Sequence, residues 1–172
     1  MKIMSMEFPI CNVCLKNEIL CSGCSKKLES NGIRDEEIRL YRNLNKTIKG
    51  EKHLKDGKIS RIYLDKNFAL IVCDKNSVPG LIGKNGIIIK KIEKILGKQI
   101  RVISDSLTFN EFIKEILFSS TVLGINIMYT QEGIKYRIRI PGNERVIMPL
   151  SPEAFASIAN TLFNTSAELV FE

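Results

Sequence analysis

The chain has 172 residues, 44% of them apolar and 26% charged, and its 26 lysines and arginines outnumber 19 aspartates and glutamates to give a net charge of +7. These values are typical of a globular protein and exclude collagen-like and low-complexity chains. Apolar runs such as Ile87–Ile89 are far shorter than the ~20 residues of a transmembrane helix. No continuous apolar stretch follows the first residues, so we expect no signal peptide, no membrane partner and a cytoplasmic protein.

The positive charge is concentrated in the first two thirds of the chain. Residues 1–58 carry 12 basic and 8 acidic groups, residues 59–106 carry 9 and 4, and residues 107–172 carry 5 and 7. A basic front and middle with an acidic tail indicates a polyanionic partner for the first two thirds. Charge alone does not decide this, because many proteins that bind no nucleic acid are equally basic.

Four of the five cysteines form the pattern C-x2-C-x6-C-x2-C, as Cys11, Cys14, Cys21 and Cys24. Two CxxC pairs supply the four thiolates that tetrahedral zinc prefers. A redox dithiol would need only one pair, and an iron–sulfur cluster is the main alternative, although the spacing differs from ferredoxin runs. We predict one structural Zn²⁺ ion in a compact knuckle over residues 1–30. Gly23 is expected to let the backbone approach the sulfurs.

Two further side chains that could be reactive, Cys73 and His53, are expected to have no chemical role. Cys73 ends the apolar run 68–73 and is expected to be a packed core thiol. His53, the single histidine, lies in a polar stretch and is expected at the surface without a partner. Because no Ser-His-Asp or Cys-His arrangement can be assembled, we expect the protein not to be an enzyme.

The middle of the chain predicts one helix followed by two strands. Helical spacing over residues 34–49 places four apolar side chains on one face. These are Ile38, Tyr41, Leu44 and Ile48. Residues 59–64 and 68–73 read as strands that are joined by a turn at 65–67.

A glycine motif between two helices follows. A short helix near 76–82 leads into Gly83-Lys84-Asn85-Gly86, and a second helix extends to Leu96 with Ile88, Ile92 and Ile95 on one face. Gly97 suits its C-cap, and 99–103 reads as a strand. A GxxG loop lets backbone approach a phosphodiester chain, and the next helix offers free N–H groups to anions. A mere helix break is the alternative. A P-loop is excluded by its missing glycine and Ser/Thr.

Residues 70–103, with the motif Val78–Gly86, resemble a KH domain, a module that binds RNA and single-stranded DNA. The order α-β-β-α-α-β over residues 31–106 resembles the type II KH fold and, more narrowly, archaeal NusA-like proteins. The resemblance implies an α+β protein that binds single-stranded RNA, either a nascent transcript or rRNA, in transcription elongation or termination. Alternatives are a ribosome-associated or ribosome-assembly factor, or an interaction module that docks on RNA polymerase or a ribosomal protein.

The resemblance also implies which residues contact RNA. The loop would hold the backbone of about four nucleotides, an apolar groove bordered by the edge strand 101–103 would hold bases, and nearby lysines would reach phosphates. The implied residues are Ile82, Gly83, Lys84, Asn85, Gly86, Ile87, Lys90, Lys91 and Arg101. With no aromatic side chain in this groove, we expect modest sequence selectivity.

Residues 107–172 predict a second small α+β domain. We expect a helix over 108–118, a hairpin of strands 122–130 and 134–140, a helix that begins at Ser151-Pro152, and a final strand 167–171. This order repeats the first module without its short helix and GxxG, so a degenerate KH-like unit is one interpretation. The acidic balance favours protein docking or domain packing. The basic stripe Lys135, Arg137 and Arg139 suits either a phosphate backbone or a solvated sheet face.

Overall fold

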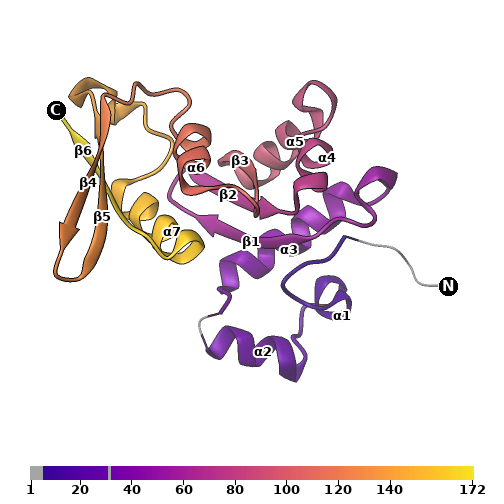
Figure 1. The fold of residues 1–172 in the computed structure, drawn as a ribbon. Coiled ribbons are helices and arrows are strands. Elements are labelled where there is room, and N and C mark those ends of the chain that lie inside the picture. The colour runs from indigo at the N-terminus through magenta and orange to yellow at the C-terminus, as the bar shows by residue number, and fades with distance from the viewer. Residues whose placement is uncertain (1–5, 31) are drawn as a thin grey trace. The chain divides into compact units, whose positions relative to one another are not determined.

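The structure is a computed structural model that describes residues 6–30 and 32–172. It is a mixed α+β fold with two three-stranded sheets, ordered β1-β2-β3 and β4-β5-β6, which confirms the predicted fold class. The chain divides into two compact units (Figure 1), one of residues 1–64 and 69–106 and one of residues 65–68 and 107–172. Among the described residues, no helix has the length and apolar character to cross a membrane.

The sheet of the first unit consists of β1 (Ile59–Leu64), β2 (Phe68–Cys73) and β3 (Gln99–Ser104). β1 and β2 pair antiparallel around the predicted turn. Every residue of the central strand β2 is buried, as its continuous apolar run predicts. β3 lies on the other side of β2, and the Asp105 N–H donates to the Cys73 carbonyl at 2.8 Å.

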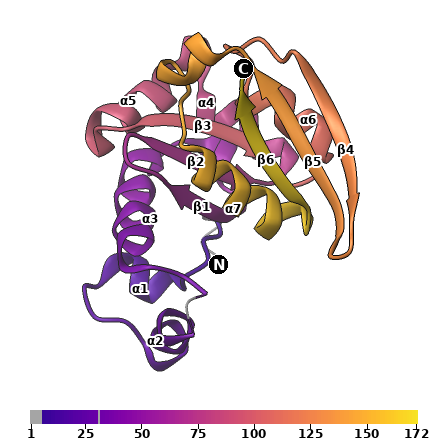
Figure 2. The same ribbon diagram turned by 90° about the vertical axis from the view of Figure 1, so that its left-hand side faces the viewer.

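Helices α3 (Asp35–Ile48), α4 (Val78–Ile82) and α5 (Ile87–Leu96) pack against this sheet (Figure 2). The element order is therefore α-β-β-α-α-β, as predicted. Short 3-10 turns lie at Lys52–Leu54, Lys75–Ser77 and Lys84–Gly86. The four apolar residues predicted to face inward from α3 are all buried.

The predicted apolar face of α5 is correct for Ile88 and Ile92 but wrong for Ile95, whose side chain is 54% exposed. Ile95 lies in the last turn of α5 and lines an open depression beside the end of α3. There α3 presents the polar side chains of Lys46 and Thr47, which leave Ile95 about half exposed.

The N-terminal segment contains two helices that the sequence analysis did not predict, α1 (Asn12–Lys16) and α2 (Ser22–Glu29). Leu15 of α1 belongs to the same buried core as the apolar face of α3. The guanidinium of Arg42 on α3 donates to the carbonyls of Cys14 at 2.9 Å and Glu18 at 3.0 Å. The cysteine segment is thus bonded to the sheet-bearing part of the first unit.

Glu37 is a buried carboxylate on α3, only 3% exposed. The Arg61 guanidinium lies 3.9 Å from it, and the Tyr41 hydroxyl donates to it at 3.5 Å. Burial raises the pKa of Glu37, and the positive charge of Arg61 offsets only part of this effect. The ionised carboxylate is therefore less favourable in the folded chain than in water.

Glu37→Gln is expected to change how stability depends on pH. A raised pKa means that the folded state binds more protons, so this contribution is present at low pH and is lost as pH rises through the raised pKa. Wild type should therefore lose stability relative to Glu37→Gln over the pH range that begins at about 4, the ordinary pKa of glutamate, and extends upward to the raised pKa of Glu37. Urea unfolding across that range measures the difference. The exposed neighbour Glu36 gives the control Glu36→Gln, and identical curves for both variants would contradict the prediction.

The second unit comprises α6 (Phe109–Ile116), β4 (Gly124–Thr130), β5 (Gly133–Ile140), α7 (Pro152–Phe163) and β6 (Ser166–Phe171), with a 3-10 turn at Gly142–Val146. β4 and β5 form the predicted antiparallel hairpin, and β6 runs parallel to β5. The Ser151 side chain caps α7, as predicted, and the Thr108 side chain caps α6, which therefore begins one residue later than expected. An aromatic cluster joins the two helices to the sheet; its members are Phe109, Phe112, Tyr136, Phe155 and Phe163.

The basic stripe on β5 is largely neutralised by the neighbouring strand. Glu168 on β6 pairs with Lys135 and, at 2.8 Å, with Arg137. Glu172 pairs with Arg139 at 2.7 Å. These carboxylates favour the solvated sheet face over a phosphate-binding stripe.

Two further expectations are corrected by the structure. Alternation with the basic stripe in strand 134–140 predicts that Ile134 faces inward. It is instead 49% exposed, because it pairs with Tyr129 close to the hairpin turn, where Tyr129 is itself exposed. His53 is exposed as expected, but it has a neighbour, since its Nδ1 lies 3.8 Å from a Glu51 carboxylate oxygen.

Candidate nucleic-acid interface and metal centre

The GxxG loop reverses the chain between α4 and α5 through unusual backbone angles. Gly83 ends α4 with φ 76° and ψ 167°, Asn85 has φ 54°, and Gly86 has φ 72° and precedes the first residue of α5. Asparagine and glycine are the residues that adopt positive φ most readily. The loop therefore presents Lys84 and Asn85 to solvent at the N-terminus of α5.

The two glycines are required for different reasons. A Cβ on Gly83 would lie 2.9 Å from the Ile88 backbone nitrogen and 2.8 Å from its Cγ1. A Cβ on Gly86 would meet nothing closer than 3.5 Å. The first glycine thus allows α5 to pack tightly behind the loop, whereas the second satisfies only the backbone conformation.

Alanine at these two positions is expected to destabilise the protein unequally. Gly86→Ala should cost about 1–2 kcal/mol, the usual penalty of a left-handed conformation. Gly83→Ala adds a clash with backbone and should cost about 3 kcal/mol or more. Urea unfolding of both variants measures the difference. Equal losses would show that the close approach of Ile88 relaxes without cost.

The other predicted RNA-contacting residues lie on α4, α5 and β3. Ile82 and Ile87 flank the GxxG loop and are 36% and 52% exposed. Lys90 and Lys91 lie in the first turns of α5 and are exposed. Arg101 is half-buried on β3, against which α4 and α5 pack. Strand 101–103 was expected to border the groove that holds bases. Val102 and Ile103 are instead buried in the core, so they offer no surface to such a groove.

The one acidic residue near the loop in sequence is held by a hydrogen bond at the end of α5 away from it. Residues 75–101 contain seven basic residues and one acidic residue, Glu93. The Glu93 carboxylate accepts a hydrogen bond of 3.0 Å from the Ile100 N–H at the start of β3. Its charge is thereby engaged at the opposite end of α5 from the loop, which favours binding of a polyanion at the GxxG end.

The four N-terminal cysteines come together as predicted. Their Sγ atoms all lie within 4.8 Å of one another, with Cys11 and Cys14 at 3.4 Å and Cys11 and Cys21 at 3.9 Å. Metal–sulfur bonds of 2.3 Å in a tetrahedron separate sulfurs by about 3.8 Å. The cluster therefore fits a single tetrahedral metal ion.

The backbone around the cysteines favours thiolates. The Cys21 N–H donates to Cys14 Sγ at 3.1 Å, and the Cys11 N–H lies 3.5 Å from Cys24 Sγ. Hydrogen bonds from the Cys14 and Cys24 backbone lower the pKa of Cys11, to about 6, and of Cys21. For Cys14 the Cys21 N–H also lowers the pKa, but burial and the neighbouring thiols outweigh it and raise the value to about 12. A divalent cation stabilises all four as thiolates.

Two details of the metal centre differ from expectation. Cys11 and Cys21 each cap a helix, α1 and α2, so each CxxC pair spans the first turn of a helix. A Cβ on Gly23 would meet nothing within 4 Å, so this glycine is not required for a close approach to sulfur. Arg42, which ties this segment to α3, was missed by sequence reasoning, because its acceptors lie 28 and 24 residues away in the chain.

Comparisons with known proteins agree with this geometry. The KH domain family matches residues 39–127, more than half of the chain, from within α3 to within β4. A crystal structure of APE1850 is similar with a TM-score of 0.55 at 17% identity, over 81% of this chain and all of that one, which shows a shared fold. No curated protein matches the chain. With the GxxG loop and its two helices inside the matched segment, the chain belongs to the KH domain family of RNA-binding modules.

Proposed function

We propose that the protein binds single-stranded RNA across the GxxG loop and catalyses no reaction. The observation that carries this proposal is the loop itself, where positive-φ backbone exposes Lys84 and Asn85 between α4 and α5. A KH loop of this kind clamps the backbone of about four nucleotides. Gly83 and Gly86 supply the positive-φ backbone angles that turn the two residues between them toward solvent.

Neighbouring side chains are assigned supporting roles. Ile82 and Ile87 offer exposed apolar surface to bases on either side of the loop. Lys90 and Lys91 follow by one turn and reach phosphates, and Arg101 contributes from β3. Residues 75–103 contain no aromatic side chain on which bases would stack, so recognition of the RNA sequence is weak.

We further propose that the four cysteines hold one structural Zn²⁺ ion and define a knuckle over residues 1–30, followed by a KH domain over 31–106 and a small α+β domain over 107–172. The all-sulfur donor set suits zinc, and four protein ligands leave no open position for substrate. The order of helices and strands in residues 107–172, α-β-β-α-β, repeats that of residues 31–106 with one helix fewer, which supports a degenerate KH-like unit in residues 107–172.

The cellular setting that we propose is cytoplasmic and NusA-like, with a nascent transcript as the RNA and RNA polymerase as a partner during elongation or termination. A ribosomal role with rRNA uses the same surface. An interaction module that has lost RNA affinity is the second candidate. One observation favours it, since β4 carries the exposed apolar side chains Ile125, Ile127 and Tyr129.

Fluorescence anisotropy of a labelled single-stranded RNA, titrated with wild-type protein at several salt concentrations, tests RNA binding. With about four phosphates neutralised, the logarithm of the binding constant should fall with the logarithm of salt with a slope near −3. Absence of binding at low salt would overturn the proposal and favour the interaction module.

A further inference from the structure

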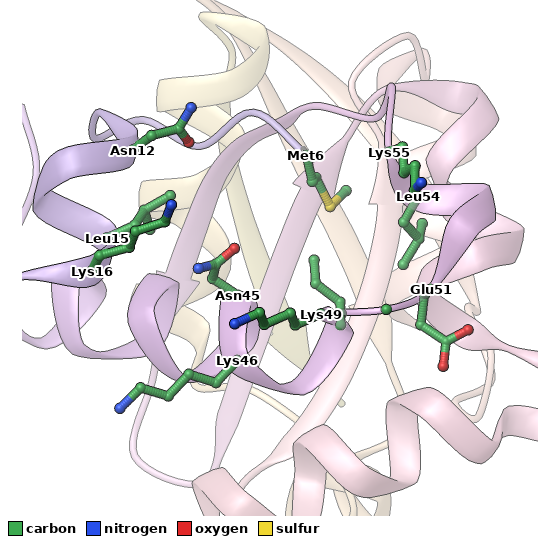
Figure 3. A pocket seen from close by; sticks show the side chains of 12 residues that line it. Met6, Asn12, Leu15, Lys16, Asn45, Lys46, Lys49, Glu51, Leu54 and Lys55 are labelled. Carbon is green, nitrogen blue, oxygen red and sulfur yellow. The ribbon is translucent and has the colours of Figure 1, made fainter. Parts of the chain in front are cut away.

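A cavity of about 550 Å³ lies in the first unit, between α1, the end of α3 and residues 49–55 (Figure 3). Its apolar lining comes from four residues that are each at least 95% buried: Met6, Leu15, Ile48 and Leu54. This volume is within the range of pockets that hold small organic ligands. No contact with the GxxG loop explains the cavity, because the loop residues do not line it.

The rim of the cavity is strongly basic. Four lysines line it: Lys16, Lys46, Lys49 and Lys55. In Figure 3, Lys46 and Lys49 extend from the end of α3 toward one side, and the carboxylate of Glu51 lies on the other. Glu51 is the single carboxylate in the lining, and it already has His53 as a neighbour at 3.8 Å. Across residues 6–30 and 32–172, no carboxylate forms an ion pair with the four lysines.

Two amide side chains complete the lining, Asn12 from α1 and Asn45 from α3. An amide offers both hydrogen-bond donors and an acceptor, which is the pattern on the edge of a nucleobase. An apolar floor, two amides and a cationic rim together match a nucleotide, with its flat base, polar base edge and phosphates.

A second, basic depression between α3 and α5 shares Lys46 with this cavity. Lys46 and Thr47 of α3 line it together with Lys91, Lys94 and Ile95 of α5. Lys46 lines both hollows, and Lys91 lies in α5 only five residues after Gly86. The two helices pack against each other, so the cations of the depression extend from Lys46 onto α5, the helix that follows the loop.

We propose that the cavity binds one unpaired nucleotide of the same RNA strand that crosses the GxxG loop. The base occupies the apolar floor beside Asn12 and Asn45, and its flanking phosphates lie at Lys46 and Lys49. This inference rests on the proposed RNA-binding function and extends it to a second subsite, reached along α5 and the end of α3. The KH loop alone serves about four nucleotides, so the second subsite requires a longer RNA.

The test compares a labelled RNA of about 4 nucleotides with one of about 15. Wild type should bind the longer RNA at least about tenfold more tightly. The variant Lys46→Ala/Lys49→Ala should lose this gain and reduce the salt slope for the longer RNA by about 1.4, while its affinity for the short RNA stays within about twofold of wild type. The control Lys26→Ala/Lys114→Ala removes the same charge from exposed positions on α2 and α6 and should behave as wild type. Thermal unfolding verifies that both variants fold.

Two further measurements separate the possible results. In RNA that carries 4-thiouridine, photo-crosslinks should map to peptides with Asn12 or Asn45 in wild type. Titration with uridine or adenosine monophosphate shows whether the free nucleotide binds the cavity as tightly as the longer RNA does, which would overturn the strand assignment. Equal loss of both RNAs in the lysine variant, or no gain with length in wild type, also overturns the second subsite. The proposed function survives those results if Lys84→Asp/Asn85→Asp still abolishes binding of the short RNA, and it falls if that variant binds normally.

Discussion

Lys84→Asp/Asn85→Asp is expected to bind single-stranded RNA at least about 100-fold more weakly than wild type at low salt. The change removes the one cation inside the loop and places two carboxylates where the proposed phosphates pass. Opposed like charges at an interface cost several kcal/mol, and 2.7 kcal/mol already corresponds to about 100-fold. The fold should persist, because Lys84 and Asn85 are exposed and aspartate tolerates the φ of 54° at position 85 nearly as well as asparagine does.

A matched control is available on α6. Asn110 and Lys114 are both exposed there, so Lys114→Asp/Asn110→Asp makes the same two substitutions and the same change in net charge. Anisotropy titrations at two salt concentrations compare the pair, and circular dichroism with thermal unfolding verifies the folds. If both double variants weaken binding equally, the effect is one of overall charge and the loop is not the RNA-binding site.

Local sequence signals predicted the elements that hold the loop. The 3.6-residue spacing in α3 and the fully apolar β2 specify their own structure, because each buries a long contiguous apolar surface. Gly83 and Gly86 marked a turn between helices in the sequence. The structure adds that only Gly83 lacks space for a Cβ, because Ile88 approaches behind it. That contact depends on the packing of α5 and has no signal in the spacing of the glycines.

Features that depend on distant partners could not be predicted. Helix α1 has five residues, too few for a periodic pattern, and it is held by Arg42 of α3. Ile95 has the correct spacing for burial but faces the polar end of a different helix. The basic rim of the cavity combines Lys16 and Lys55, which are 39 residues apart in the chain. Sequence reasoning found the residues that belong to a chemical motif and missed the cavity, which only tertiary packing assembles.

Removal of the metal is expected to lower the melting temperature by about 10 °C. A ligand present at about 1,000 times its dissociation constant stabilises the folded state by about 4 kcal/mol, and each kcal/mol shifts the midpoint of a chain of this size by about 2–4 °C. The effect reaches the core, because Cys14 and Cys24 are buried in the first unit. Elemental analysis should find one zinc ion per chain. Iron and sulfide in that analysis would identify the iron–sulfur alternative instead.

Two cysteine variants separate loss of the metal from loss of a buried thiol. Cys14 and Cys73 are both fully buried, but the Cys73 thiol lies in β2 and donates weakly to the Ile103 carbonyl at 3.7 Å. Cys14→Ser should lose the metal, and a chelator should then change its melting temperature no further. Cys73→Ser should be destabilised as well, yet keep one metal ion and its full response to the chelator. A Cys14→Ser protein with a full metal complement would show that the cluster binds no ion through this sulfur and that packing alone holds the segment.

Loss of the metal should also remove the hydrogen-exchange protection of α1 and α2, because both helices are too short to be stable in isolation. The sheet of the first unit should keep its protection.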